Sequence, residues 1–142
     1  MPANSSPTVL QFSNVPIEAC REYASGLKGL SFQLKAGELL LVRIEREDER
    51  FALADAAEGL TPPTEGSITF LEEDWQSMSA DRASAQRGKI GRMFEDEGWI
   101  SNLDLDQNIT LSQRHHTRRS EQELVEEART LARLFGLPDL PR

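Results

Sequence analysis

An apolar segment at Leu39–Ile44 is followed at once by a charged stretch and then by small and apolar residues. Five of the six residues in L-L-L-V-R-I are apolar, and this near-continuous pattern predicts a strand that is buried on both faces. Phe51–Ala57 is predicted to form a helix, with Asp48 as its N-cap and Gly59 as its C′ glycine. A strand, a short loop and a helix in this order predict an α/β domain.

Further strands are predicted where apolar or β-branched residues recur between turn residues. One helix is predicted from the cap residue Ser79 through Gln86, because Asp81 lies in its first turn and Gly88 ends it. The predicted strands are Thr8–Val15, which Pro16 should limit, Leu30–Leu34, Ser67–Leu71 and Ile90–Phe94.

A second helix is predicted after Ser120, which forms a capping box with Glu123. Its apolar residues recur at helical spacing and predict an amphipathic helix whose stripe faces the core. Gly136 and Pro138 should end it. The stripe consists of Leu124, Ala128, Leu131 and Phe135.

Composition narrows the classes of function. The 142 residues carry a net charge of −8, which argues against nucleic acid and anionic membranes as partners, because these require a basic surface. The single cysteine, Cys20, excludes an internal disulfide. No apolar run is long enough to span a membrane, and the N-terminus lacks the pattern of a signal peptide. We therefore expect a cytoplasmic protein without direct membrane insertion, peripheral to a membrane only through a partner.

The loop between the predicted strand and helix stands where a phosphate-binding loop would lie. In the pattern G-x-x-x-x-G-K-[ST], backbone N–H groups and a lysine hold phosphates and a hydroxyl holds magnesium. Here those positions fall on Ile44, Glu49, Arg50 and Phe51, and residues 45–50 contain four acids and two arginines. We expect no catalytic residue, no bound cofactor and no metal. The vestigial loop positions are Ile44, Glu45, Arg46, Glu47, Asp48, Glu49, Arg50 and Phe51.

Four segments together resemble the first half of an ABC-transporter ATP-binding subunit. The resemblance covers about three quarters of the chain. The segments follow the family's order and spacing: L-S-F-Q-L-K-A-G-E from Leu30, G-L-T-P-P-T-E-G-S-I-T-F from Gly59, K-I-G-R-M-F-E-D from Lys89 and N-L-D-L-D-Q-N-I-T-L from Asn102. The H-T at His116 and the S-E-Q-E at Ser120 are similar to ATPases of intermembrane lipid transport. The resemblance implies a partial P-loop NTPase-like α/β fold with a mixed sheet, an antiparallel β subdomain and flanking helices.

The resemblance also implies site residues. Glu95 stands at the position of the family's Q-loop glutamine, where it would either ligate a metal or be a solvated loop acid. Trp99, Ile100 and Leu103 lie in the region that contacts the membrane subunit in the family, and we expect a partner-docking surface there. The alternative is that Trp99 fills the core of its own domain.

The predicted organisation has three parts. Residues 1–7 are expected to be disordered, residues 8–111 to form the ABC ATPase-like core, and residues 112–142 to form a linker and the start of a helical subdomain. The basic run at Arg114–Arg119 is expected to be a solvated linker, because its two adjacent histidines lack the spacing of zinc ligands.

The family's signature loop, its second acidic motif and its switch histidine would follow residue 142. ATP and magnesium are the family's cofactors, but the altered loop favours a degenerate, non-hydrolytic ABC-like domain that serves as a binding or structural module in a transporter-like assembly. The alternative is an ATP-binding subunit that another chain completes. The expected partners are a membrane subunit, a second ATPase chain or further copies of this chain.

Overall fold

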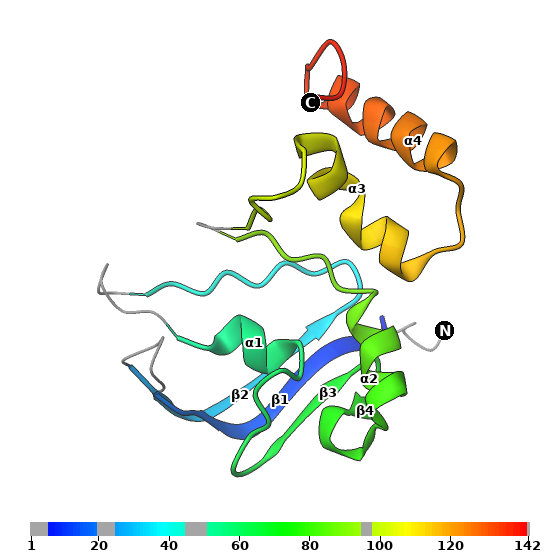
Figure 1. Cartoon of the computed structure of the whole chain (residues 1–142). Coiled ribbons are helices and arrows are strands. Elements are labelled where there is room, and N and C mark those ends of the chain that lie inside the picture. The colour runs from blue at the N-terminus through cyan, green and yellow to red at the C-terminus, as the bar shows by residue number, and fades with distance from the viewer. Residues whose placement is uncertain (1–5, 20–24, 45–50, 95–97, 142) are drawn as a thin grey trace, which may run out of the picture. The chain divides into compact units, whose positions relative to one another are not determined.

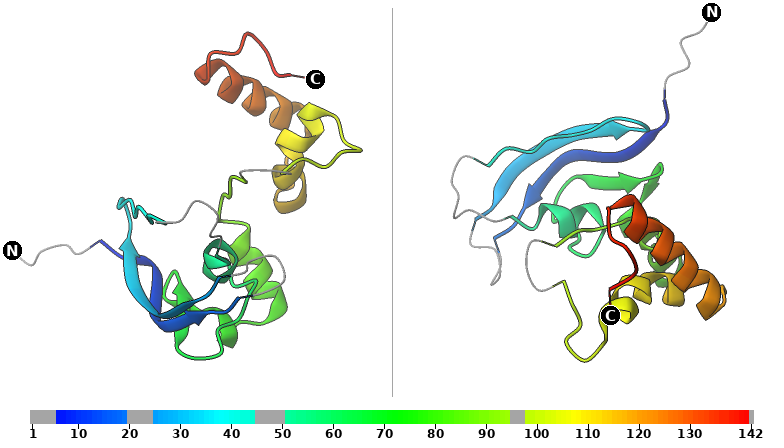
Figure 2. Two further views of the ribbon diagram at one scale, coloured as in Figure 1. Left: turned by 90° about the vertical axis from the view of Figure 1, so that its left-hand side faces the viewer. Right: turned by 90° about the horizontal axis from the view of Figure 1, so that it is seen from above.

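A computed structural model describes residues 6–19, 25–44, 51–94 and 98–141. The chain divides into two compact units, residues 1–87 and residues 88–142. The strands of the described residues lie in the first unit, and the second unit is built on two helices (Figures 1 and 2).

One antiparallel sheet organises the first unit. Its strand order is β2-β1-β3-β4, so that β1 lies between β2 and β3 (Figure 1). The sheet and its flanking helices confirm the predicted α/β class, and three of the predicted strands are present at nearly the expected positions. The strands are β1 (Thr8–Ile17), β2 (Leu27–Lys35), β3 (Ser67–Phe70) and β4 (Glu73–Asp74).

Aromatic and β-branched side chains hold the centre of this sheet. Phe12 of β1 is directly opposite Phe32 of β2 and Ile68 of β3. The two phenyl rings stack with their centroids 4.6 Å apart, as favourable cross-strand pairs do. Phe12 and Ile68 are almost fully buried. Strand β1 also continues through Pro16 to Ile17, because its pairing with β3 ends before the proline.

The pairing of β1 with β2 shifts register between Phe12 and Val15, and Gly66 of a neighbouring loop lies against the β1 backbone there. Asn14 adopts a φ of 52°, and its N–H donates to the Ser31 hydroxyl at 2.8 Å. Gly66 has a φ of 74°, and a Cβ on it would lie 2.2 Å from the carbonyl oxygen of Ser13. A side chain at position 66 would therefore collide with backbone as well as strain its own conformation.

A polar cluster joins the short strand β4 to helix α2 (Ala80–Arg87). The Glu73 carboxylate accepts hydrogen bonds from the Arg82 guanidinium and, at 2.8 Å, from the Gln86 amide. The hydrogen bond to Glu73 raises the pKa of Arg82. Helix α2 begins after Ser79, whose hydroxyl accepts from the Arg82 N–H at 3.3 Å, as predicted from the sequence.

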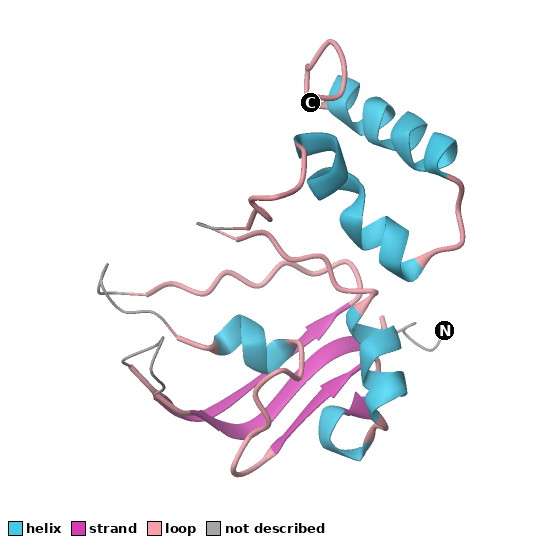
Figure 3. Cartoon of the chain, viewed as in Figure 1, coloured by secondary structure: helices cyan, strands magenta, loops and turns pink. Residues whose placement is uncertain are grey.

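Two predicted strands are absent from the described residues. Leu39–Ile44 and Ile90–Phe94 belong to no β ladder, and Figure 3 draws both as loop. Leu39 is 95% exposed and Leu41 is 86% exposed, so the prediction of a strand buried on both faces is wrong. Apolarity reports a preference for burial, but a strand also needs neighbours that complete its hydrogen bonds.

The described residues of the second unit contain two helices, α3 (Leu105–His116) and α4 (Glu121–Leu134). Helix α4 begins with the predicted capping box, since the Ser120 hydroxyl accepts from the Glu123 N–H and the Glu123 carboxylate accepts from the Ser120 N–H. Its last residue is Leu134, and Gly136 follows the C-cap with a φ of 79°, while the Leu137 N–H donates to the Ala132 carbonyl at 2.9 Å. This is the glycine cap that the sequence predicts.

The buried face of α4 differs from the predicted stripe. Leu124 and Ala128 are buried as expected, but Leu131 is 49% exposed and Phe135 is 84% exposed. Ala132 is buried instead. The buried residues of α4 thus follow a spacing of four residues, with Ala132 on the buried face in place of Leu131.

Candidate functional site

The position of the expected phosphate loop is described only at its two ends. Ile44 is 44% exposed at the end of the irregular segment 39–44, and Phe51 is half-buried. The predicted loop positions between them lie outside the described residues: Glu45, Arg46, Glu47, Asp48, Glu49 and Arg50.

Helix α1 (Leu53–Ala57) follows this loop and lies against the sheet (Figure 1). Ala52, and not the predicted Asp48, occupies its N-cap position and offers no side-chain hydrogen bond to the helix. Ala52 and Ala56 are both buried. The helix is thus held by its apolar face. Its five residues give it little of the dipole that a longer helix offers to an anion.

The C-terminal end of α1 is fixed by the indole of Trp75. Gly59 has a φ of 66°, and the Leu60 N–H donates to the Asp55 carbonyl at 2.8 Å in a glycine cap. The Trp75 indole N–H donates to the Ala57 carbonyl at 3.1 Å. Its ring stacks on Phe70 with centroids 5.6 Å apart. Trp75 is buried and has a packing role.

The second candidate region is the loop at residues 98–104, which we call the Trp99 loop. Trp99 is 60% exposed and Ile100 is 43% exposed, whereas Leu103 is half-buried. An aromatic side chain with this exposure does not fill a core. Glu95, the expected Q-loop position, lies outside the described residues.

Asn108 holds the Trp99 loop in one conformation. Its Oδ1 accepts from the Ile100 N–H at 2.8 Å. Its Nδ2 lies 3.1 Å from each of three carbonyl oxygens, those of Ile100, Leu103 and Asp104. One carboxamide therefore satisfies both polar backbone groups of Ile100 and ties them to the start of α3.

The first turn of α3 is capped at the same place. The Asp104 N–H donates to the Gln107 Oε1 at 3.0 Å, and the Leu103 N–H donates to the Ile100 carbonyl at 3.1 Å. Sequence reasoning named the apolar residues of the loop but not Asn108. The available signal was an asparagine, a weak helix former, inside an otherwise helical segment.

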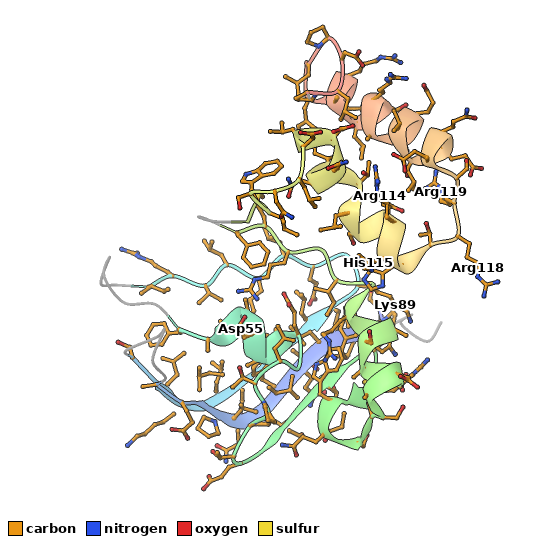
Figure 4. The ribbon with its side chains drawn as sticks, viewed as in Figure 1. Asp55, Lys89, Arg114, His115, Arg118 and Arg119 are labelled. Atoms are coloured by element: carbon orange, nitrogen blue, oxygen red, sulfur yellow. The ribbon has the colours of Figure 1, made fainter. Side chains whose placement is uncertain are left out.

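The C-terminal half of α3 is anchored to the start of α4. The Thr110 hydroxyl is buried, donates to the Asp106 carbonyl at 2.8 Å and accepts from the Arg114 Nε at 2.9 Å. Arg114 also pairs with Glu121, and Arg119 pairs with Glu127. Figure 4 shows Arg114 on α3 and Arg119 on the linker that follows it. Part of the basic run is thus engaged in ion pairs within this unit rather than free in a linker.

A metal centre and a membrane-spanning helix are both absent from the described residues. Over the ranges described above, no group of three or more His, Cys, Asp and Glu side chains is arranged to hold a metal ion. Likewise, no helix within those ranges has the length and apolarity needed to cross a lipid bilayer. The Trp99 loop is therefore the best-defined candidate surface.

The fold is similar to that of the ATP-binding cassette MJ0796, whose structure is a dimer in a post-hydrolysis state bound to ADP and Pi. The similarity has a TM-score of 0.65 at 19% sequence identity, and it covers 87% of this chain and 57% of that chain. No protein-family model and no curated protein matches the sequence. The chain thus has an ABC ATPase-like fold and spans little more than half the length of the cassette it matches.

Proposed function

We propose that this chain is a degenerate ABC-like ATP-binding domain that does not hydrolyse ATP and serves as a binding or structural module in a transporter-like assembly. The observation that carries the proposal is the sequence between Ile44 and Phe51. A phosphate loop needs glycines so that backbone N–H groups can face the phosphates. No glycine lies between Gly37 and Gly59.

Charge supports the same conclusion. Residues 45–50 hold four acids against two arginines. Two like charges about 4 Å apart repel by about 1 kcal/mol even in water, and by more where water is excluded. A triphosphate placed against this segment would meet repulsion where a phosphate loop offers lysine and backbone N–H groups. Phe51 also stands at the position of the hydroxyl that would hold magnesium.

The docking role is assigned to Trp99, Ile100 and Leu103. Interfaces derive most of their affinity from a few anchors, and tryptophan is prominent among them. Trp99 is exposed, and the loop that carries it is already held by Asn108. A loop that is ordered before binding loses less conformational entropy when a partner arrives. The proposed partner is a membrane subunit of a transporter.

A photo-crosslinking amino acid at position 99 tests the docking role. With p-benzoylphenylalanine in place of Trp99, we expect a cross-link to an integral membrane protein in membranes of the native host. The matched control carries the same group at Leu134, which is 78% exposed on α4. Equal cross-linking from both positions, or none from position 99, would contradict a docking role for this loop.

The alternative is an ATP-binding subunit that a second chain completes. Its support is that the similar cassette MJ0796 is a dimer bound to ADP and Pi. In this arrangement Arg50 would be the remaining phosphate contact. Phosphate release from Mg-ATP by the purified chain, lost in an Arg50→Ala variant, would favour this alternative over the non-hydrolytic module.

A further inference from the structure

The surface around the Trp99 loop combines apolar groups with uncompensated negative charge. Trp99 and Ile100 are exposed, and α3 continues the apolar surface with Leu105 and Ile109, which are each 39% exposed. The last two are four residues apart and therefore lie on one side of the helix.

The charge of this region has one sign. From residue 98 to residue 113 the sequence contains two aspartates and no lysine or arginine. Asp104 is exposed at the N-cap of α3, and Asp106 lies in its first turn. Neither carboxylate forms an ion pair with a base in the described part of the chain. The two charges are thus available to a partner.

This combination selects among classes of partner. Anionic lipid and nucleic acid would be repelled by the two aspartates and by the net charge of −8. A protein segment with an apolar anchor and basic flanking residues would satisfy both features. Charges at the edge of an apolar contact mainly set the association rate, the salt dependence and the choice of partner.

We infer that the Trp99 loop and the first turn of α3 bind a short protein segment in which apolar residues are flanked by lysine or arginine. The inference rests on the proposed docking role and adds the chemistry of the partner. Trp99 and Ile100 supply the apolar contact. Asp104 and Asp106 supply the charge that distinguishes a basic segment from a neutral or acidic one.

An unbiased peptide selection tests this assignment. A phage-displayed library of random dodecapeptides is selected on the wild-type chain and depleted on a Trp99→Ser variant. We expect the enriched peptides to combine leucine or aromatic residues with two or more lysines or arginines. Enrichment of Trp99-dependent peptides that are neutral or acidic would overturn the charge assignment and leave the docking role standing. If no Trp99-dependent peptide is enriched, the docking role itself fails.

A pair of double variants measures the charge term directly. Asp104→Asn with Asp106→Asn removes two charges from the surface, and asparagine keeps the ability to cap α3. Glu65→Gln with Asp81→Asn removes two charges from exposed positions in the other unit. Both double variants change the net charge equally.

The affinity of one selected basic peptide is then measured for each variant at about 0.05 M and about 0.5 M salt. We expect the Asp104/Asp106 variant to bind about two- to tenfold more weakly at low salt and to show a smaller salt dependence. The Glu65/Asp81 control should bind as the wild type does. Equal loss of affinity in both double variants would overturn the inference, because it would mean that only the overall charge matters.

Discussion

At the scale of single residues, Asn108 fixes the backbone of the Trp99 loop through its side-chain hydrogen bonds. Its carboxamide is the acceptor for the Ile100 N–H and a donor toward the carbonyls of Ile100, Leu103 and Asp104. These side-chain hydrogen bonds hold the loop backbone in place, as backbone hydrogen bonds between neighbours hold a strand. The hydrogen bonds of Asn108 therefore fix a loop conformation in which Trp99 is exposed.

Replacing Asn108 tests this role. Asn108→Ala removes the partner of one N–H and of three carbonyls, and we expect a loss of about 1–3 kcal/mol in the free energy of unfolding of the second unit. Hydrogen exchange at the Ile100 amide should become markedly faster. The control is Asn102→Ala, because Asn102 is exposed in the same loop; it should change stability by less than about 0.5 kcal/mol. Equal effects of the two changes would contradict the role given to Asn108.

Replacing Gly66 with alanine provides a second test at this scale, and the same replacement at Gly37 is the control. Both residues have a positive φ, 74° and 84°, but a Cβ at Gly37 would meet nothing within 4 Å. Gly37→Ala should therefore cost only the conformational penalty of about 1–2 kcal/mol. Gly66→Ala should cost clearly more, because its Cβ would overlap the Ser13 carbonyl. Urea unfolding of the two variants measures the difference, and similar midpoints would contradict the close approach described here.

At the scale of elements, the buried face of α4 separates two leucines of the same helix. Leu124 is 3% exposed, and Leu134 is 78% exposed. Leu124→Ala should cost about 2–5 kcal/mol, because it removes buried methyl groups and leaves a cavity. Leu134→Ala should cost less than about 1 kcal/mol. If thermal unfolding ranks them in the opposite order, the face of α4 is assigned wrongly.

The capping box of α4 predicts a dependence on pH. The pKa of Glu123 is lowered, first by the hydrogen bond from the Ser120 N–H and then by the Ser120 hydroxyl. A carboxylate with a lowered pKa in the folded state stabilises that state above its unfolded pKa, and the stabilisation is lost as pH falls through the folded value. The wild type should thus lose more stability below about pH 4.5 than a Glu123→Gln variant does. Parallel unfolding curves of the two proteins over this range would contradict the prediction.

The elements also show what the sequence can and cannot predict. The caps at Ser79, Ser120, Gly59 and Gly136 were predicted correctly because each depends on neighbouring residues and on local backbone geometry. The segment Leu39–Ile44 was predicted wrongly because a strand depends on partners elsewhere in the chain.

Contacts between side chains could not be predicted from the sequence pattern. Asn108 went unrecognised because a carboxamide that binds loop carbonyls follows no sequence period. The stripe of α4 was displaced because periodicity alone allows either Leu131 or Ala132 on the buried face. In both cases the answer depends on which atoms approach closely in three dimensions, which a pattern of apolar positions does not contain.

At the scale of the whole molecule, the chain has an ABC ATPase-like fold, and we propose that its sequence between Ile44 and Phe51 does not hold a triphosphate. The fold similarity covers 87% of the chain at 19% identity, so fold and site are separate questions. In this proposal the docking surface does not depend on a bound nucleotide, because Asn108 holds the Trp99 loop through hydrogen bonds to Ile100. The proposed function therefore assigns to this chain the fold of the cassette without its nucleotide site.

Calorimetric titration with Mg-ATP tests the central claim most directly. The wild-type chain at tens of micromolar is titrated to millimolar Mg-ATP. A variant with Ile44→Gly, Glu49→Gly, Arg50→Lys and Phe51→Thr serves as the comparison. We predict no saturable heat from the wild type, because its loop offers carboxylates where phosphates need N–H groups and lysine. Saturable binding by the wild type at micromolar Mg-ATP, lost in Arg50→Ala, would contradict the account.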